Sequence, residues 1–410
     1  MSFSDASNPS LDVMRSTIAM RIPPICCSPG TTKENTSSLY GGRKVDGRSL
    51  TYMSELRIGV IGTGMMGCEH LRNLMGIENV AVTAISDPHE EQHGWARHTL
   101  GDQAAGVAEF TDHRDLLNSG LVDAVLVAAP NFTHKSLLDD IFETNIPVLV
   151  EKPMCTTVED CISVVKAQSQ RSAITWVGLE YRYMAPIAGL LHELRSGIIG
   201  NMKMMSIREH RFPFLVKVDN WNRFSQNTGG TLVEKCCHFF DLMNVAVGSQ
   251  PVRVIASGGQ DVNHLDEVYD GKRSDILDNA YVIVEYANGV RTMLDLSMFA
   301  EGGQHEQEIT VVGDKGKLEA FIPGDGKIFF GERSSRSVRE IEVPTDPDIA
   351  HMGFHFGASF IECKRFVDAV LNNTQPEVTV VDGLWSVVIG AAAHKSIDEQ
   401  RPVLISEYGL

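Results

Sequence analysis

The first residues that could do chemistry are the glycines of the segment Gly62-Thr63-Gly64-Met65-Met66-Gly67, which follows the apolar run Leu56–Ile61 and precedes a helical pattern. Between a strand and a helix, Gly62 permits a tight turn, Gly64 lets a pyrophosphate approach the backbone, and Gly67 lets the helix pack closely on the strand. The start of the helix adds unpaired N–H groups and a positive dipole end. The pattern therefore predicts dinucleotide binding, with an ordinary glycine-rich turn as the alternative.

An acidic residue, Asp87, ends the next predicted strand, Val80–Ser86, and lies 25 residues after Gly62. A carboxylate at this place can accept hydrogen bonds from the ribose hydroxyls of adenosine and repels a 2′-phosphate. The next arginine along the chain is Arg97. We therefore expect NAD rather than NADP; capping of the following helix is the alternative role of Asp87.

A lysine, Lys152, stands directly after the apolar strand Pro147–Val150, in the sequence Glu151-Lys152-Pro153. In an open α/β sheet, ligands bind beyond the carboxyl ends of the strands. Lys152 is therefore placed to contact a substrate, although composition alone is also compatible with an ordinary surface lysine.

A glutamate and a histidine, Glu234 and His238, are four residues apart in a predicted helix that begins at Gly229-Gly230-Thr231. This spacing puts both side chains on one helix face, and Asp241 is placed to orient the imidazole. A histidine ionises in the range that a general base needs near neutral pH. A solvated helix pair is the alternative, and one histidine with one acid is too few ligands for a metal site, so we expect no metal.

The segment before this helix is rich in positive charge and in residues suited to a sugar ring. Five residues between positions 203 and 223 are basic, and only two, Glu209 and Asp219, are acidic. We predict that Arg182, Tyr183, Trp221 and Arg223 bind the substrate, and one hypothesis is that Arg182, Trp221 and Arg223 favour an anionic sugar. The alternative is a solvated sheet edge that balances acidic neighbours, which leaves a neutral polyol as the substrate.

The elements that position these residues fall into two parts. Strands alternate with helices up to the strand Ile174–Leu179, which predicts a parallel sheet with right-handed crossovers over residues 55–178. From about residue 200, six strands follow one another, and Asn288-Gly289 predicts a hairpin turn. These strands are Lys203–Arg211, Val252–Gly258, Ala280–Tyr286, Val290–Phe299, Glu308–Val312 and Lys317–Ile322. We therefore expect a second α/β domain, residues 179–410, with a large open, mainly antiparallel sheet and the helices Ala185–Ser196, Leu232–Val247, Ser359–Leu371 and Val381–Asp398.

Composition is that of a globular protein. The 410 residues are 43% hydrophobic and 22% charged, and the net charge of −17 argues against a general nucleic-acid binder. The longest apolar runs have the length of a buried strand, so no membrane span is expected. Eight cysteines without a C-x-x-C pair favour reduced thiols in the cytoplasm. Residues 1–54 contain ten serines and a net charge of +2, which indicates a disordered tail or, alternatively, an organelle transit peptide.

In its motifs and their order the sequence resembles the Gfo/Idh/MocA family of NAD(P)-dependent oxidoreductases. The glycine-rich turn, Pro130-Asn131-Phe132-Thr133-His134, Glu151-Lys152-Pro153 and the block that ends in Asp241 carry the resemblance from Leu56 onward. It implies a Rossmann domain followed by an α/β domain whose sheet face makes oligomer contacts, hence a homodimer or homotetramer. It also implies that Pro130, Asn131, His134, Glu151 and Lys152 join Gly62–Gly67 and Asp87 in binding the cofactor.

The resemblance implies that Lys152 and His238 form the catalytic pair and that Glu234 assists, although the family usually has aspartate at that position. The implied reaction is reversible oxidation of a secondary alcohol of a cyclic polyol or sugar, such as an inositol. His238 takes the hydroxyl proton and Lys152 stabilises the alkoxide. Two alternatives within the family are an NAD-dependent glycosidase, in which oxidation is transient, and a catalytically inactive nucleotide-binding regulator.

Overall fold

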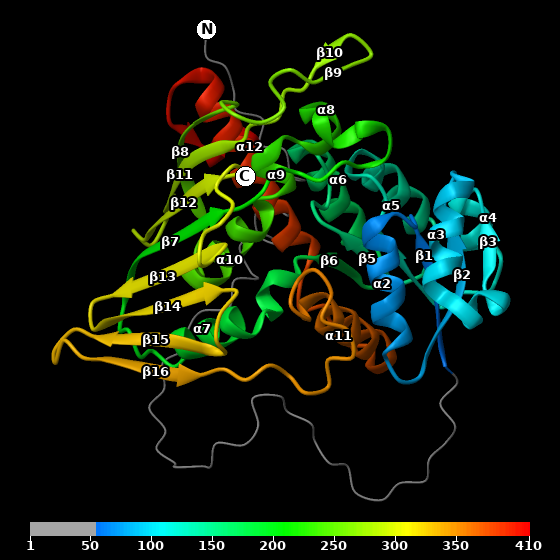
Figure 1. Ribbon diagram of the computed structural model, residues 1–410, viewed down its shortest axis with the longest axis horizontal. Coiled ribbons are helices and arrows are strands. Elements are labelled where there is room, and N and C mark those ends of the chain that lie inside the picture. Colours follow the sequence, from blue (N-terminus) through cyan, green and yellow to red (C-terminus); the bar gives the residue numbers. More distant parts are fainter. Residues whose placement is uncertain (1–54) are drawn as a thin grey trace, which may run out of the picture.

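The computed structural model describes residues 55–410, so the predictions for residues 1–54 lie outside it. Two sheets organise the chain: a six-stranded sheet with its helices, and a nine-stranded sheet beside them (Figure 1). The predicted α/β class is thereby confirmed. No helix among residues 55–410 is long and apolar enough to cross a membrane.

The six-stranded sheet is parallel throughout and has the order β3-β2-β1-β4-β5-β6. The strands are β1 (Leu56–Ile61), β2 (Val80–Ser86), β3 (Ala108–Phe110), β4 (Ala124–Val127), β5 (Val148–Glu151) and β6 (Thr175–Gly178). The crossover helices are α2 (Met65–Met75), α3 (Glu90–Leu100), α4 (His113–Asn118), α5 (His134–Phe142) and α6 (Val158–Gln168). Strand order reverses between β1 and β4, which is where the crevice for a ligand opens in such sheets.

Continuous apolar runs explain why this sheet is buried on both faces. All four residues of β4 and all four of β5 are buried. Helices cover both sides of a parallel sheet, so its strands need no polar face. The carboxyl ends of β1, β4, β5 and β6 therefore meet at one edge, where the predicted cofactor and catalytic residues follow.

The nine-stranded sheet has the order β16-β15-β14-β13-β7-β12-β11-β8-β17 and is antiparallel except between β7 and β12. Its strands are β7 (Met202–His210), β8 (Pro251–Gly259), β11 (Asn279–Tyr286), β12 (Arg291–Ser297), β13 (Gln307–Gly313), β14 (Gly316–Ile322), β15 (Lys327–Glu332), β16 (Val338–Glu342) and β17 (Val403–Leu404). A separate hairpin consists of β9 (Val268–Tyr269) and β10 (Lys272–Arg273). The six predicted strands match six of these, and Gly289, at φ +83°, forms the predicted hairpin turn. Sequence patterns missed β15 and β16, an edge hairpin whose last strand is largely exposed and lacks apolar alternation.

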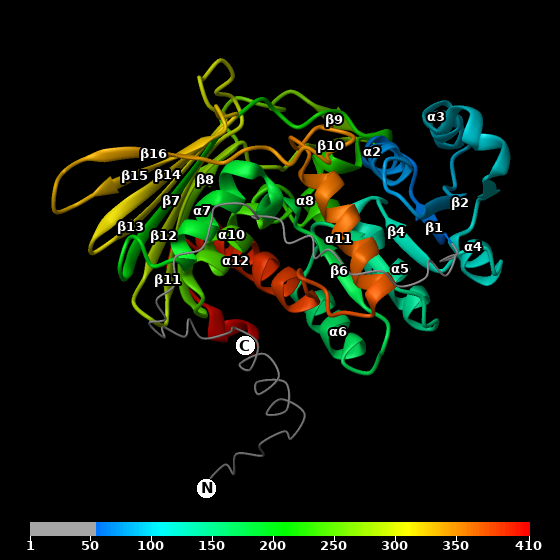
Figure 2. The same ribbon diagram turned by 90° about the horizontal axis from the view of Figure 1, so that it is seen from below.

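Helices α7 (Ala185–Arg195), α10 (Cys237–Val247) and α12 (Val380–Glu399) lie between the large sheet and the parallel sheet (Figure 2). On β11, Ala280, Val282 and Val284 point to these helices and are buried, whereas Tyr281 and Ile283 on the other face are exposed. Helix α11 (Ala358–Asn372) packs against α2, and α12 packs against α6. The C-terminal helices therefore return to the parallel sheet and hold the two parts together.

The predicted helix Leu232–Val247 is wrong in one respect: it is two helices. A short helix, α9 (Thr231–Glu234), ends before α10 begins at Cys237. The break lies at Lys235 and Cys236. The buried Lys235 ammonium there lies 2.9 Å from Glu209 and donates a 2.7 Å hydrogen bond to the Tyr181 hydroxyl.

Candidate active site

Of the three glycines in the glycine-rich turn, only Gly64 has open space beside its backbone. Gly62 has φ +88°, and a Cβ there would lie 2.7 Å from the backbone of Ala128. A Cβ on Gly67 would lie 2.1 Å from the Gly62 carbonyl oxygen, so helix and strand are in direct contact. A Cβ on Gly64, in contrast, would meet only the Gln92 side chain, at 3.8 Å. The free side of Gly64 and the first turn of α2, at Met65 and Met66, form an open cradle of N–H groups that suits a pyrophosphate.

Asp87 is buried at the end of β2 and faces this turn. Its Oδ2 accepts a 2.9 Å hydrogen bond from the backbone N–H of Thr63, and its Oδ1 accepts one of 3.0 Å from that of His89. Each carboxylate oxygen has a second lone pair, so ribose hydroxyls can still donate to it. Asp87 therefore braces the glycine turn. It is not the N-cap of α3, because that position is His89.

The loop after β4 offers one unpartnered donor. Asn131 is buried, and its Nδ2 has no hydrogen-bond partner, an unmet polar atom that the edge of a bound dinucleotide would satisfy. Its neighbour Pro130 precedes it at the end of β4. His134 is different: its ring nitrogens lie 2.8 Å from the Pro153 carbonyl oxygen and 3.0 Å from that of Ala129. His134 thus ties the loops after β4 and β5 together, and its contact with the cofactor stays a prediction.

Glu151 also holds neighbouring elements in place, and its contact with the cofactor stays a prediction. Its Oε1 lies 2.7 Å from Nε2 of His70 on α2, and its Oε2 accepts the backbone N–H of Lys152 at 3.0 Å. The other His70 nitrogen lies 3.3 Å from Sγ of Cys363 on α11. Burial acts to raise the pKa of Glu151, but His70 outweighs it and lowers that pKa to about 2. Glu151 therefore fixes the backbone of the lysine that follows it.

The ammonium of Lys152 reaches the break between α9 and α10. Its Nζ donates a 3.3 Å hydrogen bond to the backbone oxygen of Glu234, which also accepts from Sγ of Cys237 at 3.4 Å. The helix break frees this carbonyl, since a continuous helix would occupy it with an N–H group. Burial acts to lower the pKa of Lys152, but Cys237 and nearby carboxyl groups outweigh it, so the pKa is raised and the lysine is charged.

The Glu234 carboxyl group is buried, and its Oε2 has no hydrogen-bond partner. Burial raises the pKa of Glu234 to about 7, although Lys152, Lys217 and Arg223 act to lower it. A buried carboxyl oxygen without a hydrogen-bond partner destabilises the fold unless a ligand supplies that partner. Glu234 is thus available to a substrate hydroxyl.

His238 is buried in the first turn of α10. Its ring stacks on Tyr181, with centroids 3.9 Å apart, and its Nδ1 lies 3.8 Å from Oε2 of Glu180. Burial and the positive charges of Lys152 and Lys235 hold the pKa of His238 well below its usual value, so the imidazole is neutral. A neutral imidazole can accept a proton, which a general base requires.

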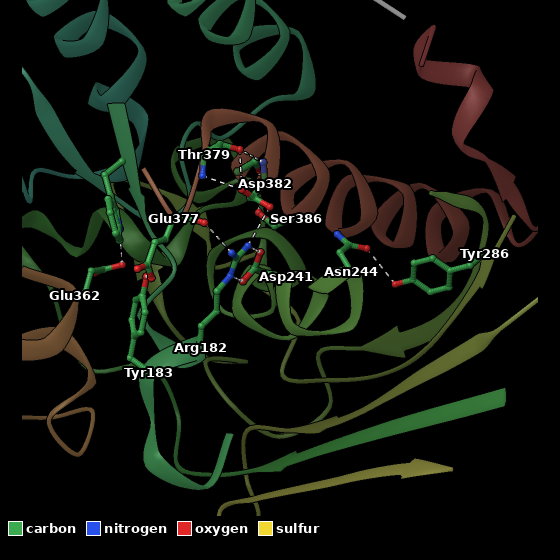
Figure 3. Close-up of polar contacts among 12 residues, drawn as sticks. Arg182, Tyr183, Asp241, Asn244, Tyr286, Glu362, Glu377, Thr379, Asp382 and Ser386 are labelled. Atoms are coloured by element: carbon green, nitrogen blue, oxygen red, sulfur yellow. Dashed lines mark hydrogen bonds and ion pairs between the residues drawn. The ribbon is translucent and has the colours of Figure 1, made fainter. Parts of the chain in front are cut away.

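The expectation that Asp241 orients His238 is wrong. Both Asp241 oxygens accept hydrogen bonds from Arg182, at 2.6 Å from Nε and in a second, closer contact from Nη2 (Figure 3). Arg182 also donates to the Glu377 carbonyl oxygen at 3.2 Å and lies 3.1 Å from Asp382. Packing brings these groups together across 59 residues of sequence, so local spacing could not reveal the pair.

Two predicted substrate residues are occupied by the protein itself. The Arg182 guanidinium is engaged as just described, and the hydroxyl of Tyr183 donates to Glu377 at 3.1 Å. Both side chains therefore stabilise the packing of α12 and of the segment that leads into it (Figure 3).

The other two predicted substrate residues come from the short 3-10 helix Val218–Arg223. Trp221 meets the edge of Phe132, in the loop after β4, with centroids 6.2 Å apart. Arg223 is buried and pairs with Glu267 at 3.0 Å, but its Nη1 has no partner. Trp221 therefore lies against the cofactor side of the molecule, and Arg223 keeps one free donor.

Sequence reasoning missed Glu180, Lys217 and His355. Glu180 lies two residues beyond β6, which ends at Gly178, so the strand-end argument used for Lys152 applies to it equally. Lys217 is half-buried, and burial lowers its pKa while Glu234 opposes the shift. His355 lies in the loop before α11, with Nδ1 3.2 Å from Oε1 of Glu180, and carries no local signal.

Comparisons with known families agree with this arrangement. A family model described as the NAD-binding Rossmann fold of the oxidoreductase family GFO_IDH_MocA matches residues 56–179. The model of that family's C-terminal alpha/beta domain matches residues 192–405. Together they cover more than half of the chain.

Individual relatives match over most of their length. The myo-inositol 2-dehydrogenase of Thermotoga maritima is 27% identical over 361 residues, covering 86% of this chain and 99% of that protein. Inositol 2-dehydrogenase 1 of Saccharopolyspora erythraea is 24% identical over 356 residues, covering 85% and 96%.

Solved structures share the fold. The crystal structure of a probable dehydrogenase from Thermotoga maritima matches with a TM-score of 0.71 and 26% identity, over 86% of this chain and 100% of that one. Levoglucosan dehydrogenase, in complex with NADH and levoglucosan, matches in fold with a TM-score of 0.74 at 18% identity, over 85% and 99%. The family models confirm the resemblance seen in the motifs, and the chain belongs to the Gfo/Idh/MocA family of oxidoreductases.

Proposed function

We propose that this protein is an NAD-dependent dehydrogenase that oxidises a secondary alcohol of a cyclic polyol, with an inositol as the leading substrate. The observation that carries the proposal is the convergence of a charged lysine, Lys152, and the buried groups Glu234 and neutral His238 at the end of β5. The inositol 2-dehydrogenase names of two relatives support the substrate class.

The chain's residues divide the work of binding and proton transfer. The Gly64 turn, the first turn of α2, Asp87 and Asn131 would hold NAD, which supplies the acceptor for the hydride. His238 takes the hydroxyl proton of the alcohol. Lys152 donates a hydrogen bond to the oxygen as negative charge develops on it, which is the electrostatic help that a fixed donor provides in a water-poor site.

Specificity for a polyol needs several polar atoms without partners in the protein. Glu234 Oε2, Arg223 Nη1 and Asn222 Oδ1 are all buried and lack hydrogen-bond partners. They offer one donor and two acceptors, and Trp221 offers an aromatic surface for the ring. We therefore assign these residues, with Lys152 and His238, to the substrate site and leave Arg182 and Tyr183 out of it.

A neutral substrate is favoured over an anionic sugar. The anionic hypothesis relied on Arg182 and Arg223, and both guanidinium groups pair with acids of the protein, Asp241 and Glu267. A third cation, Lys217, lies near Glu234, and the carboxyl group of Glu234 partly offsets its positive charge.

One assay separates this function from its two alternatives within the family. Purified protein is incubated with NAD and a panel of inositols, aldoses and aryl glycosides, and NADH absorbance and aglycone release are both followed. Steady NADH formation with a polyol supports the dehydrogenase. Aglycone release without NADH indicates the glycosidase, and tight NAD binding with no reaction indicates the regulator.

We further propose that the outer face of the large sheet joins copies of the chain into a homodimer or homotetramer. Met204, Tyr281, Ile283 and Met293 are exposed on this face, and Ile283 pairs directly with Met293 across β11 and β12. Contiguous exposed apolar side chains on a sheet typically mark an interface. Sedimentation equilibrium of wild type and of Ile283→Asp tests this: the variant should be monomeric, and a wild-type monomer contradicts it.

We also propose a reducing, cytoplasmic location, because the described cysteines are free thiols. The six cysteines among residues 55–410 are buried and form no disulfide. Fractionation of cells that express the full chain, including residues 1–54, checks this against import into an organelle.

A further inference from the structure

Three groups from distant parts of the chain form a line that leads away from His238. Nδ1 of His238, on α10, lies 3.8 Å from Oε2 of Glu180, which follows β6. The other carboxyl oxygen of Glu180, Oε1, lies 3.2 Å from Nδ1 of His355, in the loop before α11. A single carboxyl group thus stands between two imidazoles.

Three of the four polar atoms of this line have no hydrogen-bond partner, and the fourth, Nδ1 of His355, also lies 3.3 Å from Oγ of Ser359. Neither Glu180 oxygen has a hydrogen-bond partner, and neither has His238 Nδ1, although all three atoms are buried. Native proteins rarely leave buried polar atoms unpaired, and such atoms call for an explanation. Structural stabilisation does not explain them, because an unpaired buried carboxyl group destabilises the fold.

The line also runs from the interior to the surface. The side chains of His238 and Glu180 are 1% and 2% exposed, whereas that of His355 is 20% exposed. Tyr181 stacks on the ring of His238, and Nδ1 of His238 is buried. His238 therefore has no direct contact with solvent through Nδ1, and a proton that it receives needs a way out.

Protonation states in the line are compatible with transfer. Burial, reinforced by Glu151, raises the pKa of Glu180 to about 8 against the opposing charges of Lys152 and Lys235. Burial, with Lys235 and Lys152, lowers the pKa of His355 to about 3, and the Glu151 charge opposes this. Glu362 also faces Glu180, and Ser359 Oγ lies 3.3 Å from His355 Nδ1. At neutral pH the acid is largely protonated and both imidazoles are neutral.

We propose that Glu180 and His355 carry the proton released by alcohol oxidation from His238 to solvent. The inference rests on the proposed function, in which His238 is the base. Before reaction, Oε2 of Glu180 faces the Nδ1–H of His238, and the proton on Oε1 faces Nδ1 of His355. This tautomer leaves Nε2 of His238 free to take the hydroxyl proton.

Proton transfer then balances at every atom. The substrate proton binds Nε2 of His238, the Nδ1 proton passes to Oε2 of Glu180, and the Oε1 proton passes to Nδ1 of His355. His355 releases one proton to water from Nε2. Each imidazole then carries its proton on the opposite nitrogen, so rotation of the carboxyl group and a tautomer shift of both rings restore the starting state. The 3.8 Å step is longer than a hydrogen bond of about 2.7–3.2 Å, so a small side-chain shift must close it during turnover.

Two variants and one control test the path. Glu180→Gln keeps the size of the side chain but cannot relay a proton, and His355→Ala removes the surface end. His351→Ala is the matched control, because His351 lies in the same loop and contacts Glu69 instead. We expect kcat to fall about 10-fold or more in both path variants, less than the roughly 10²–10⁴-fold loss for a direct general base. KM, NAD affinity and the kcat of the control should stay at wild-type values.

Buffer rescue and proton release distinguish a path from mere structural support. Imidazole added at increasing concentration should restore kcat in His355→Ala, with saturation, and should leave wild type unaffected. In stopped flow with a pH indicator, proton release should lag behind NADH formation in Glu180→Gln and coincide with it in wild type. Proton release that matches wild type in both variants, or a loss of kcat that imidazole does not restore, would overturn the proposal.

Failure of the function itself gives a different result. If wild type forms no NADH with any polyol, or if His238→Ala retains activity, the dehydrogenase assignment is wrong. If wild type is active and His238→Ala is inactive while Glu180→Gln and His355→Ala behave like wild type, only the path is wrong. Thermal unfolding of each variant identifies a folding defect, and Glu180→Asp, which keeps the carboxyl group, should then retain part of the activity.

Discussion

His70 on α2 and Glu151 at the end of β5 meet through a 2.7 Å contact between Nε2 and Oε1, both buried. The glycine turn and Lys152 are thereby linked, because α2 begins at the glycine turn and Glu151 also accepts a hydrogen bond from the backbone N–H of Lys152. A displacement of α2 is therefore transmitted to Lys152 through one pair of side chains.

Removing His70 should destabilise the protein strongly. His70→Ala leaves a buried carboxylate without its partner, which typically costs about 3–5 kcal/mol in the free energy of unfolding. Urea denaturation at pH 7 measures this loss. His98→Ala, an exposed histidine on α3, is the control and should change the value by less than about 0.5 kcal/mol. Equal stability of the two variants would show that the contact has no energetic weight.

The same pair gives the protein an acid-sensitive component. The pKa of Glu151 is lowered from 4.5 to about 2, so the stabilisation it provides is complete above pH 4.5 and is lost as the pH falls from there toward 2. Unfolding midpoints measured from pH 6 to pH 2 should fall more steeply in wild type than in Glu151→Gln. Parallel curves would contradict the assignment.

Lys152 and His238 should each be necessary for turnover. We expect Lys152→Ala and His238→Ala to lower kcat by roughly 10²–10⁴-fold, because a group that transfers a proton or stabilises the developing charge is lost. NAD affinity, measured by fluorescence titration, should remain close to that of wild type. Lys166→Ala, an exposed lysine on α6, provides the control. Activity near the wild-type level in either variant would refute the site.

Glu234 should set the pH dependence near neutrality. Its pKa of about 7 means that the carboxylate forms between about pH 6 and 8, where it favours the protonated His238 that results from oxidation. We expect kcat for oxidation to rise over this range in wild type and to be flatter in Glu234→Gln, with a smaller overall loss than for His238→Ala. A pH profile identical to wild type would exclude this role.

Asp87 should decide between NAD and NADP. Replacing it in Asp87→Ser with His89→Arg removes the carboxylate that repels a 2′-phosphate and adds a cation beside it. The ratio of kcat/KM for NADP to that for NAD should increase. His89→Arg alone is the control and should shift the ratio less. A wild-type preference for NADP would show that Asp87 does not contact the ribose.

Arg182 should matter for stability and not for substrate charge. Arg182→Ala leaves Asp241 buried without its partner, and we expect a loss of about 3–5 kcal/mol in the free energy of unfolding. The KM of the wild-type enzyme for a neutral inositol should not change with salt, since no ionic contact to the substrate is screened. A KM that rises with salt for an anionic sugar would support the alternative, in which a cationic pocket binds an anionic substrate.

Features that depend on short stretches of chain were predictable from the amino-acid sequence. The glycine turn, the acid at the end of β2 and the lysine after β5 are local, because a parallel sheet places the residues that follow its strands at one edge. Hydrophobic patterning was sufficient for six strands of the large sheet and for four helical segments. It was insufficient for β16, because the exposed edge strand Val338–Glu342 needs no apolar face. It also missed β15, although that strand alternates between buried and partly exposed residues.

The pairing of buried side chains, in contrast, could not be predicted from local sequence. Spacing suggested that Asp241 orients His238. In the structure, Asp241 pairs with Arg182, and the carboxyl group near His238 is that of Glu180. The predicted helix breaks after Glu234, which frees the carbonyl oxygen that Lys152 binds. His355 reaches Glu180 from 175 residues away along the chain. These pairings depend on how whole elements pack against each other, and the energy of a buried ion pair depends on surroundings that no local pattern contains.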